Sequence, residues 1–159
     1  MATRSMIGIR LTANTTMFGK EYKKGTIISV YCHSDGYPED VGARLQRTFN
    51  TEAKAIELIS GGYMSSCYKK ITGAGGVRNE MQQVDGSWKY VEVPNPVHSF
   101  ATPTKDETVY YARDRGEHIQ WDVDTSMKSY ACADGMIAYY YIFKDGIWKV
   151  SQGSSFRKF

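Results

Sequence analysis

The sequence predicts an α+β fold, in which a mostly antiparallel sheet carries two consecutive helices packed on one face. Apolar residues that alternate with polar ones indicate strands near the start of the chain. Apolar residues spaced by four indicate a helix after Pro38. Two Asp-Gly pairs, at 85–86 and 145–146, lie between alternating runs and indicate hairpins. With 159 residues and no internal repeat, residues 1–159 are expected to form one domain.

Two strands open the chain. Residues 6–12 alternate, which places Ile7 and Ile9 on one face. Residues 26–32 form the second predicted strand. If that strand continues a little further, Tyr31, His33 and Asp35 point to the side opposite its core residues.

Two helices are predicted over about 38–60. Pro38 suits the first helical position, and the acidic pair Glu39 and Asp40 complements the positive helix end. Asn50 or Thr51 is expected to separate this helix from the next, which ends before Gly61-Gly62. The core-facing stripe of the first helix is predicted to be Val41, Leu45 and Phe49.

The second half of the chain, 81–150, is expected to be strand-rich and to form an antiparallel meander. Its predicted strands are 81–84, 87–93, 107–112, 136–143 and 147–150. Residues 119–133 are expected to hold a strand or a turn around Trp121. Polar or glycine-rich composition predicts loops at 13–25, 71–80 and 94–106, and a loose tail at 151–159.

Composition excludes several classes of protein. A net charge of +3, from 20 basic and 17 acidic residues, with no basic stripe argues against a nucleic-acid partner. No apolar run is long enough to span a membrane. The cysteines Cys32, Cys67 and Cys132 lack zinc-ribbon spacing, and no motif predicts a cofactor. Twelve tyrosines favour an interface, a stacking pocket or sheet packing.

Two blocks of sequence carry a resemblance. Residues 31–42, YCHSDGYPEDVG, and residues 107–117, ETVYYARDRGE, resemble a family of small, largely uncharacterised accessory proteins of tailed bacteriophages. Those proteins repeat a YCHxDGYPExxG block near the first helix and an RDRGE block about 70 residues later. Ser34 departs from the family pattern, which has Trp there. The resemblance implies a phage origin and a location in the host bacterial cytoplasm, but it brings no assigned reaction.

Both blocks end a predicted strand with polar residues, so they could share one edge of the sheet. One interpretation is a pocket for a nucleotide-like small molecule, with arginines on phosphate and tyrosines stacked on a base. Glu39 and Asp40 would oppose an anion there. The candidate ligand-binding residues are His33, Asp35, Tyr37, Arg113, Asp114 and Arg115.

Two other interpretations stay open. A metal-assisted phosphoester hydrolase could use His33, Asp35, Asp114 and His118, although no complete catalytic or metal-binding motif is present. Alternatively, Asp35-Gly36 shapes a turn and Asp114 braces an arginine, while an aromatic surface binds a host protein. We expect a phage accessory protein that binds rather than catalyses and counters host immunity by sequestering a nucleotide-derived signal. Exposed strand edges are also compatible with a homo-oligomer.

Overall fold

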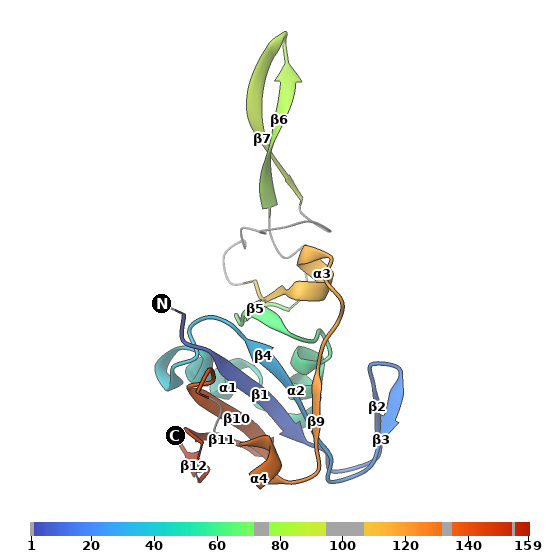
Figure 1. Ribbon diagram of the computed structural model, residues 1–159, viewed down its shortest axis with the longest axis vertical. Coiled ribbons are helices and arrows are strands. Elements are labelled where there is room, and N and C mark those ends of the chain that lie inside the picture. Colours follow the sequence, from blue (N-terminus) through green and yellow to red (C-terminus); the bar gives the residue numbers. More distant parts are fainter. Residues whose placement is uncertain (1, 72–76, 95–106, 132–134, 154) are drawn as a thin grey trace.

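A central strand, β1 (Ser5–Arg10), organises the main sheet. The computed structural model describes residues 2–71, 77–94, 107–131, 135–153 and 155–159 (Figure 1). On one side β1 pairs antiparallel with β4 (Ile27–Cys32), and on the other it pairs with β10 (Tyr139–Lys144). The strand predicted at 26–32 is therefore confirmed.

The remaining strands extend the sheet in both directions. The order is β12-β11-β10-β1-β4-β5-β8, and β9 pairs with the first half of β4. The added strands are β5 (Met64–Ser66), β8 (Val109–Tyr110), β9 (Asp122–Asp124), β11 (Ile147–Ser151) and β12 (Arg157–Lys158).

The sheet is mostly antiparallel, as predicted, but it is not a meander. β1 pairs with β10 in parallel, and so does β4 with β5. The C-terminal hairpin therefore adds beside the first strand of the chain, about 130 residues away in sequence. Local periodicity reports which residues form a strand, but it carries no signal of which strand lies beside it.

The two helices follow the predicted pattern. A short π-helical turn, η1 (Pro38–Gly42), leads directly into α1 (Ala43–Thr48). The Thr51 side chain caps α2 (Glu52–Ile59) by accepting a hydrogen bond from the Lys54 backbone N–H at 3.2 Å. The predicted stripe of Val41, Leu45 and Phe49 is buried.

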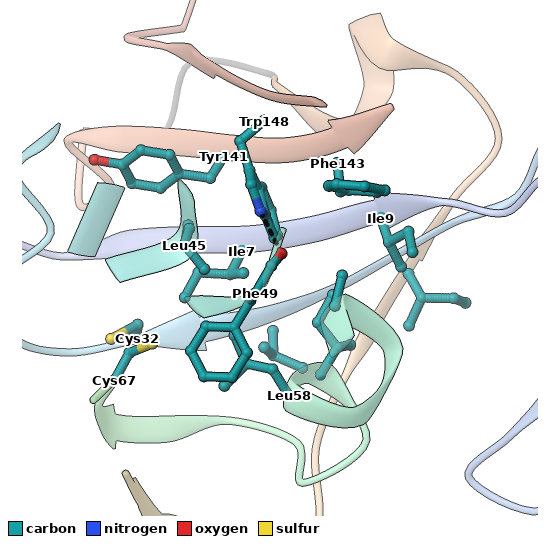
Figure 2. Packing of buried hydrophobic residues seen from close by; sticks show 14 of the residues in the cluster. Ile7, Ile9, Cys32, Leu45, Phe49, Leu58, Cys67, Tyr141, Phe143 and Trp148 are labelled. Carbon is teal, nitrogen blue, oxygen red and sulfur yellow. Dashed lines mark hydrogen bonds between the residues drawn. The ribbon is translucent and has the colours of Figure 1, made fainter. Parts of the chain in front are cut away.

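These helices cover one face of the sheet and form the larger core (Figure 2). Leu45 and Phe49 pack with Ile7 and Ile9 of β1. The Trp148 indole N–H of β11 donates to the Phe49 carbonyl at 2.7 Å, which ties the C-terminal hairpin to the end of α1. A buried Trp N–H needs such a partner.

The opposite face carries a smaller core under α4 (Met127–Tyr130), where Tyr130 packs with Ile27, Tyr140 and Ile142. The Tyr130 hydroxyl donates to the Tyr141 carbonyl at 2.5 Å. Gly8 permits this packing, because a Cβ there would lie 3.0 Å from the Tyr130 ring.

Both predicted Asp-Gly hairpins are present. β6 (Val77–Val84) pairs with β7 (Ser87–Pro94), and β10 pairs with β11. Asp85-Gly86 and Asp145-Gly146 all have positive φ, which matches the type I′ turn of a two-residue loop. In Figure 1 the β6–β7 hairpin extends away from the main sheet.

The prediction of a loop at 13–25 is wrong. β2 (Thr15–Met17) and β3 (Lys20–Tyr22) form a hairpin whose turn is Phe18-Gly19. Phe rarely adopts positive φ, so turn chemistry gave no signal. The Phe18 ring is instead stacked 4.3 Å from Trp121, a contact between distant residues.

Three other boundaries need correction. A loop is predicted at 71–80, but residues 77–80 belong to β6. Residues 72–76 of that loop, and residues 95–106 of the loop predicted at 94–106, lie outside the described residues. The strand predicted at 107–112 covers only Val109–Tyr110 and gives way to α3 (Tyr111–Arg115). The tail is not loose, because β12 pairs with β11 and Phe159 packs on Tyr141.

Candidate functional site

A groove runs along the sheet face opposite α1 and α2. It consists of two hollows of about 400 and about 390 Å³ that share Tyr31, Tyr63 and Met136. Five tyrosines and three carboxylates contribute to its lining, and we call it the tyrosine groove. These residues are Tyr31, Tyr63, Tyr111, Tyr130, Tyr140, Glu117, Asp122 and Asp124.

The sequence folds so that different elements meet here. Tyr31 comes from β4, where strand alternation turns it away from the larger core. Asp122 and Asp124 lie at alternate positions of β9 and share a side. The segment that joins α2 to β5 supplies Tyr63, whose ring centroid is 5.7 Å from that of Tyr31.

Neutral hydroxyls hold the two β9 carboxylates. The Tyr63 hydroxyl donates to Asp122 Oδ2 at 2.5 Å, and the Ser129 hydroxyl donates to Asp124 Oδ1 at 2.6 Å. Burial, followed by the hydrogen bond to Asp122, raises the pKa of Tyr63 well above its usual range. Burial likewise raises the pKa of Tyr130 and of Tyr111. These phenols are therefore neutral donors at physiological pH.

The first sequence block contributes to the groove through Tyr31 rather than through the predicted residues. His33 Nδ1 and the Tyr31 hydroxyl share a 2.8 Å hydrogen bond, so His33 holds the side chain of a groove residue without lining the groove itself. Asp35 is exposed with φ of 58°, and its carbonyl accepts from the Val41 N–H at 3.1 Å. Asp35 thus shapes the entry to the helices.

Tyr37 lies outside the groove. Its side chain is 44% exposed and meets Tyr139 edge-on with ring centroids 5.9 Å apart. Its carbonyl accepts hydrogen bonds from Asp40 and Gly42. The adjoining Gly36 is buried, and a Cβ there would lie 2.8 Å from the Thr3 carbonyl oxygen, so the Gly-Tyr-Pro turn needs glycine.

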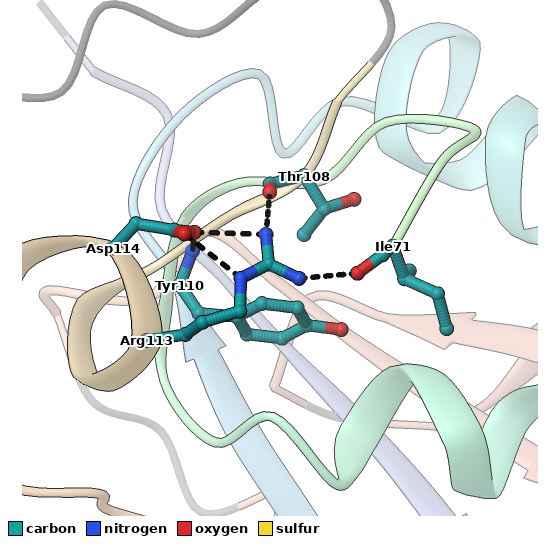
Figure 3. A network of polar contacts seen from close by, with 5 residues as sticks. All are labelled: Ile71, Thr108, Tyr110, Arg113 and Asp114. Atoms are coloured by element: carbon teal, nitrogen blue, oxygen red, sulfur yellow. Dashed lines mark hydrogen bonds and ion pairs between the residues drawn. The ribbon is translucent and has the colours of Figure 1, made fainter. Parts of the chain in front are cut away.

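Arg113 and Asp114 form an internal brace (Figure 3). Arg113 Nε lies 2.8 Å from Asp114 Oδ1, and Arg113 also donates to the carbonyls of Thr108 and Ile71. Asp114 is fully buried and accepts from the Tyr110 N–H at 2.8 Å. Most of the guanidinium donors are therefore directed to acceptors within the chain rather than outward as a fork.

Arg115 supports the groove wall. Its guanidinium lies 4.5 Å over the Tyr111 ring, and its Nε is 2.9 Å from Glu117 Oε2. Tyr111 and Glu117 line the groove, whereas Arg115 is not among its lining residues.

The two blocks therefore meet in space, but through unexpected residues. Tyr31 of the first block and Tyr111 and Glu117 of the second line the same hollow. None of the six predicted residues is among those that line the tyrosine groove. Sequence reasoning did not select Asp122 and Asp124 as site residues, although their i, i+2 spacing in the stretch 119–133 was a usable sign that they share one side of a strand.

A second surface lies on the β6–β7 hairpin. Met81, Trp88 and Tyr90 are 48%, 66% and 75% exposed. The register pairs Met81 with Tyr90 and Gln83 with Trp88. Because directly paired residues share a face, these side chains form one aromatic face of the hairpin. Trp88 thus lies exposed on the hairpin, whereas Trp148 is buried in the larger core.

No protein-family model, curated protein or solved structure matches this chain. In the described ranges, no helix is long and apolar enough to cross a membrane. Within the same residues, no three His, Cys, Asp or Glu side chains are grouped so that they could hold a metal ion.

Proposed function

We propose that this protein is a bacteriophage accessory protein that interferes with a host process by binding a host protein. Its aromatic face, formed by Met81, Trp88 and Tyr90, would be the contact surface. The sequence blocks at 31–42 and 107–117 support the phage origin, and the exposure of these three side chains supports the mode of action. It would act in the bacterial cytoplasm and, in our hypothesis, against immunity.

The aromatic face is the observation that carries the proposal. Trp and Tyr dominate the binding energy of protein interfaces, because they bury a large area with few rotatable bonds. Three large side chains that share one exposed face are the arrangement expected of such an anchor. The face is regular, since β6 and β7 pair over eight residues without a bulge.

The low stability expected of an isolated hairpin also favours a partner at this face. A two-stranded hairpin has little apolar surface of its own to bury and is at best marginally stable in water. A partner that covers Met81, Trp88 and Tyr90 would remove this surface from water and stabilise the hairpin.

A pull-down from infected bacteria tests the proposal. The bait is the full chain, compared with a variant that carries Trp88→Ala and Tyr90→Ala. The matched control carries Gln82→Ala and Lys89→Ala, because Gln82 and Lys89 pair with each other on the opposite face of the hairpin. We expect one host protein to bind the natural chain and the control, and to lose at least about tenfold in affinity with the first variant.

The captured protein is then purified and mixed with each variant, so that direct binding and stoichiometry are measured. Equal binding of the aromatic variant and the control would overturn the role of this face. Failure to capture any protein from infected cells would count against a host-protein target.

Sequestration of a nucleotide-derived signal is a second candidate function. The observation that favours it is the set of tyrosine rings in the groove next to Arg4, which lines the same hollow as Tyr31 and Tyr111. Tyrosine faces stack on nucleobases, and an arginine suits a phosphate. Heat denaturation of protein from infected cells should then release an intact nucleotide, and Tyr31→Ala should prevent its capture. A nucleotide panel without any thermal shift would exclude this function.

A further inference from the structure

Two carboxylates line one end of the tyrosine groove, and among the described residues neither forms an ion pair. Asp122 and Asp124 both line the hollow of about 400 Å³. Within the described part of the chain, each accepts one hydrogen bond, from the neutral hydroxyls of Tyr63 and Ser129 respectively. A neutral donor orients a carboxylate but leaves its charge in place. The lining residues of this hollow include no lysine or arginine.

Ser29 gives a second, independent observation at the same place. Its side chain is fully buried and lines the hollow, and Oγ has no hydrogen-bond partner among the described residues. A buried hydroxyl without a partner is unfavourable, and native proteins rarely leave one. Such an atom at the floor of a hollow indicates a polar group that comes from outside the chain.

Strand register places these three acceptors together. Ser29 of β4 and Asp122 of β9 are direct partners in an antiparallel pair, so their Cα atoms are about 5 Å apart. Asp124 is two residues further along the same strand, about 7 Å away on the same side. The remaining oxygens, Asp122 Oδ1, Asp124 Oδ2 and Ser29 Oγ, therefore belong to side chains on one side of two paired strands that line the same hollow.

We call the end of the groove that holds Ser29, Asp122 and Asp124 the corner, and its walls are aromatic. Tyr63 and Tyr31 meet at 5.7 Å with planes tilted by 50°, and Tyr130 meets Tyr140 edge-on at 5.7 Å. Aromatic faces attract cations through their quadrupole and also pack against an alkyl chain. Carboxylates at the end of an aromatic channel match a ligand with a positive head and an apolar stem.

We propose that this corner of the groove binds a primary alkylammonium group. Its nitrogen would donate to Asp122, Asp124 and Ser29, and its alkyl stem would lie along the touching rings of Tyr31 and Tyr63. An ammonium carries three N–H donors, which equals the number of acceptors here. A lysine side chain and a free diamine share this chemistry. The corner and the aromatic face of the hairpin have no residue in common, so either proposal can fail alone.

Titration of the full isotope-labelled chain, followed by NMR, tests this site. The probes are cadaverine and Nα-acetyl-lysine amide, and Nα-acetyl-norleucine amide is the uncharged control. We expect saturable shifts in β9 and α4 with an ammonium probe and none with the norleucine amide. Binding of cadaverine alone assigns a free diamine, binding of the lysine amide alone assigns a peptide lysine, and binding of both supports the shared headgroup. If neither ammonium probe saturates the shifts, the site is wrong.

Three variants localise the binding. Asp124→Asn removes one charge but keeps an oxygen for Ser129, and it should weaken probe binding about tenfold or more. Asp145→Asn changes the net charge equally in a distant turn where Asn is tolerated at φ of 55°, and it should leave binding unchanged. Ser29→Ala should weaken binding severalfold without unfolding the chain, so it decides the matter if Asp124→Asn does not fold. Unchanged binding in both Asp124→Asn and Ser29→Ala, or an equal loss in Asp145→Asn, would overturn the proposal.

Discussion

Arg113 and Asp114 are neighbours in the chain whose side chains turn back on each other, with Arg113 Nε 2.8 Å from Asp114 Oδ1. Asp114 also accepts the N–H of Tyr110, the residue that precedes α3. The pair fixes the start of this short helix, and the Arg113 guanidinium reaches on to the Ile71 carbonyl. Two residues that resemble ligand-binding groups in sequence thus connect β8, α3 and the segment after β5.

Loss of this brace should destabilise the fold. Asp114→Ala leaves the Tyr110 N–H without its acceptor and Arg113 without its counter-ion, so we expect the free energy of unfolding to fall by about 3 kcal/mol. Urea unfolding at neutral pH measures this. Arg115→Gln on the same helix is the control, since Arg115 pairs with the partly exposed Glu117 and should cost less than about 1 kcal/mol. Similar losses in both variants would contradict the brace.

Gly61 is required by close packing at the end of α2. A Cβ on Gly61 would lie 2.2 Å from Tyr110 Cε1, and Tyr110 cannot retreat because its hydroxyl donates to the Leu58 carbonyl at 2.6 Å. Gly61→Ala should lower the free energy of unfolding by about 2–3 kcal/mol through overpacking. Gly135→Ala, where a Cβ meets nothing within 4 Å, should change stability by less than about 0.5 kcal/mol. Thermal unfolding of both variants provides the comparison.

The two buried cysteines should be inert in the folded protein. Cys32 and Cys67 are free and buried, and burial raises the pKa of Cys32 to about 12. At pH 8 the thiolate fraction is then about one in ten thousand. In a Cys132→Ser background, a thiol reagent should label no cysteine until denaturant is added, and then two. Rapid labelling of the native chain would show that the helix-covered core opens readily.

Stability should fall at alkaline pH. Burial raises the pKa of Tyr141 and of Tyr130 above the ordinary value of about 10. The unfolded chain therefore releases protons that the folded chain keeps, so the stabilisation is complete below pH 10 and is lost progressively above it. Urea unfolding at pH 7, 9 and 11 measures this dependence.

Tyr141→Phe separates the two roles of that tyrosine. It should lose about 1 kcal/mol at pH 7, because the hydroxyl no longer donates to the Gly36 carbonyl. Above pH 10 its stability should decline less steeply than that of the natural chain, by up to about 1.4 kcal/mol per pH unit. An identical alkaline slope in both proteins would show that Tyr141 does not contribute to the titration.

Local rules identified most of the elements. The Asp85-Gly86 and Asp145-Gly146 turns, the Val41-Leu45-Phe49 stripe and the Thr51 cap are all present, because backbone preference and side-chain period act within a few residues. The Phe18-Gly19 turn was missed because it depends on a contact with a distant residue rather than on local preference. Its unfavourable φ is held by a stack on Trp121, about 100 residues away.

The fold and the candidate site also contain features that the sequence predicts and features that only the tertiary structure shows. The sequence by itself determined the α+β class, the two consecutive helices, both Asp-Gly hairpins and the pair of blocks whose residues meet in the groove. Only the tertiary structure decided that Arg113 is an internal brace, that Asp122 pairs with Ser29, and that β10 lies parallel to β1. Helical and strand periods are encoded locally, whereas strand order and side-chain partners depend on how distant segments bury their apolar faces together.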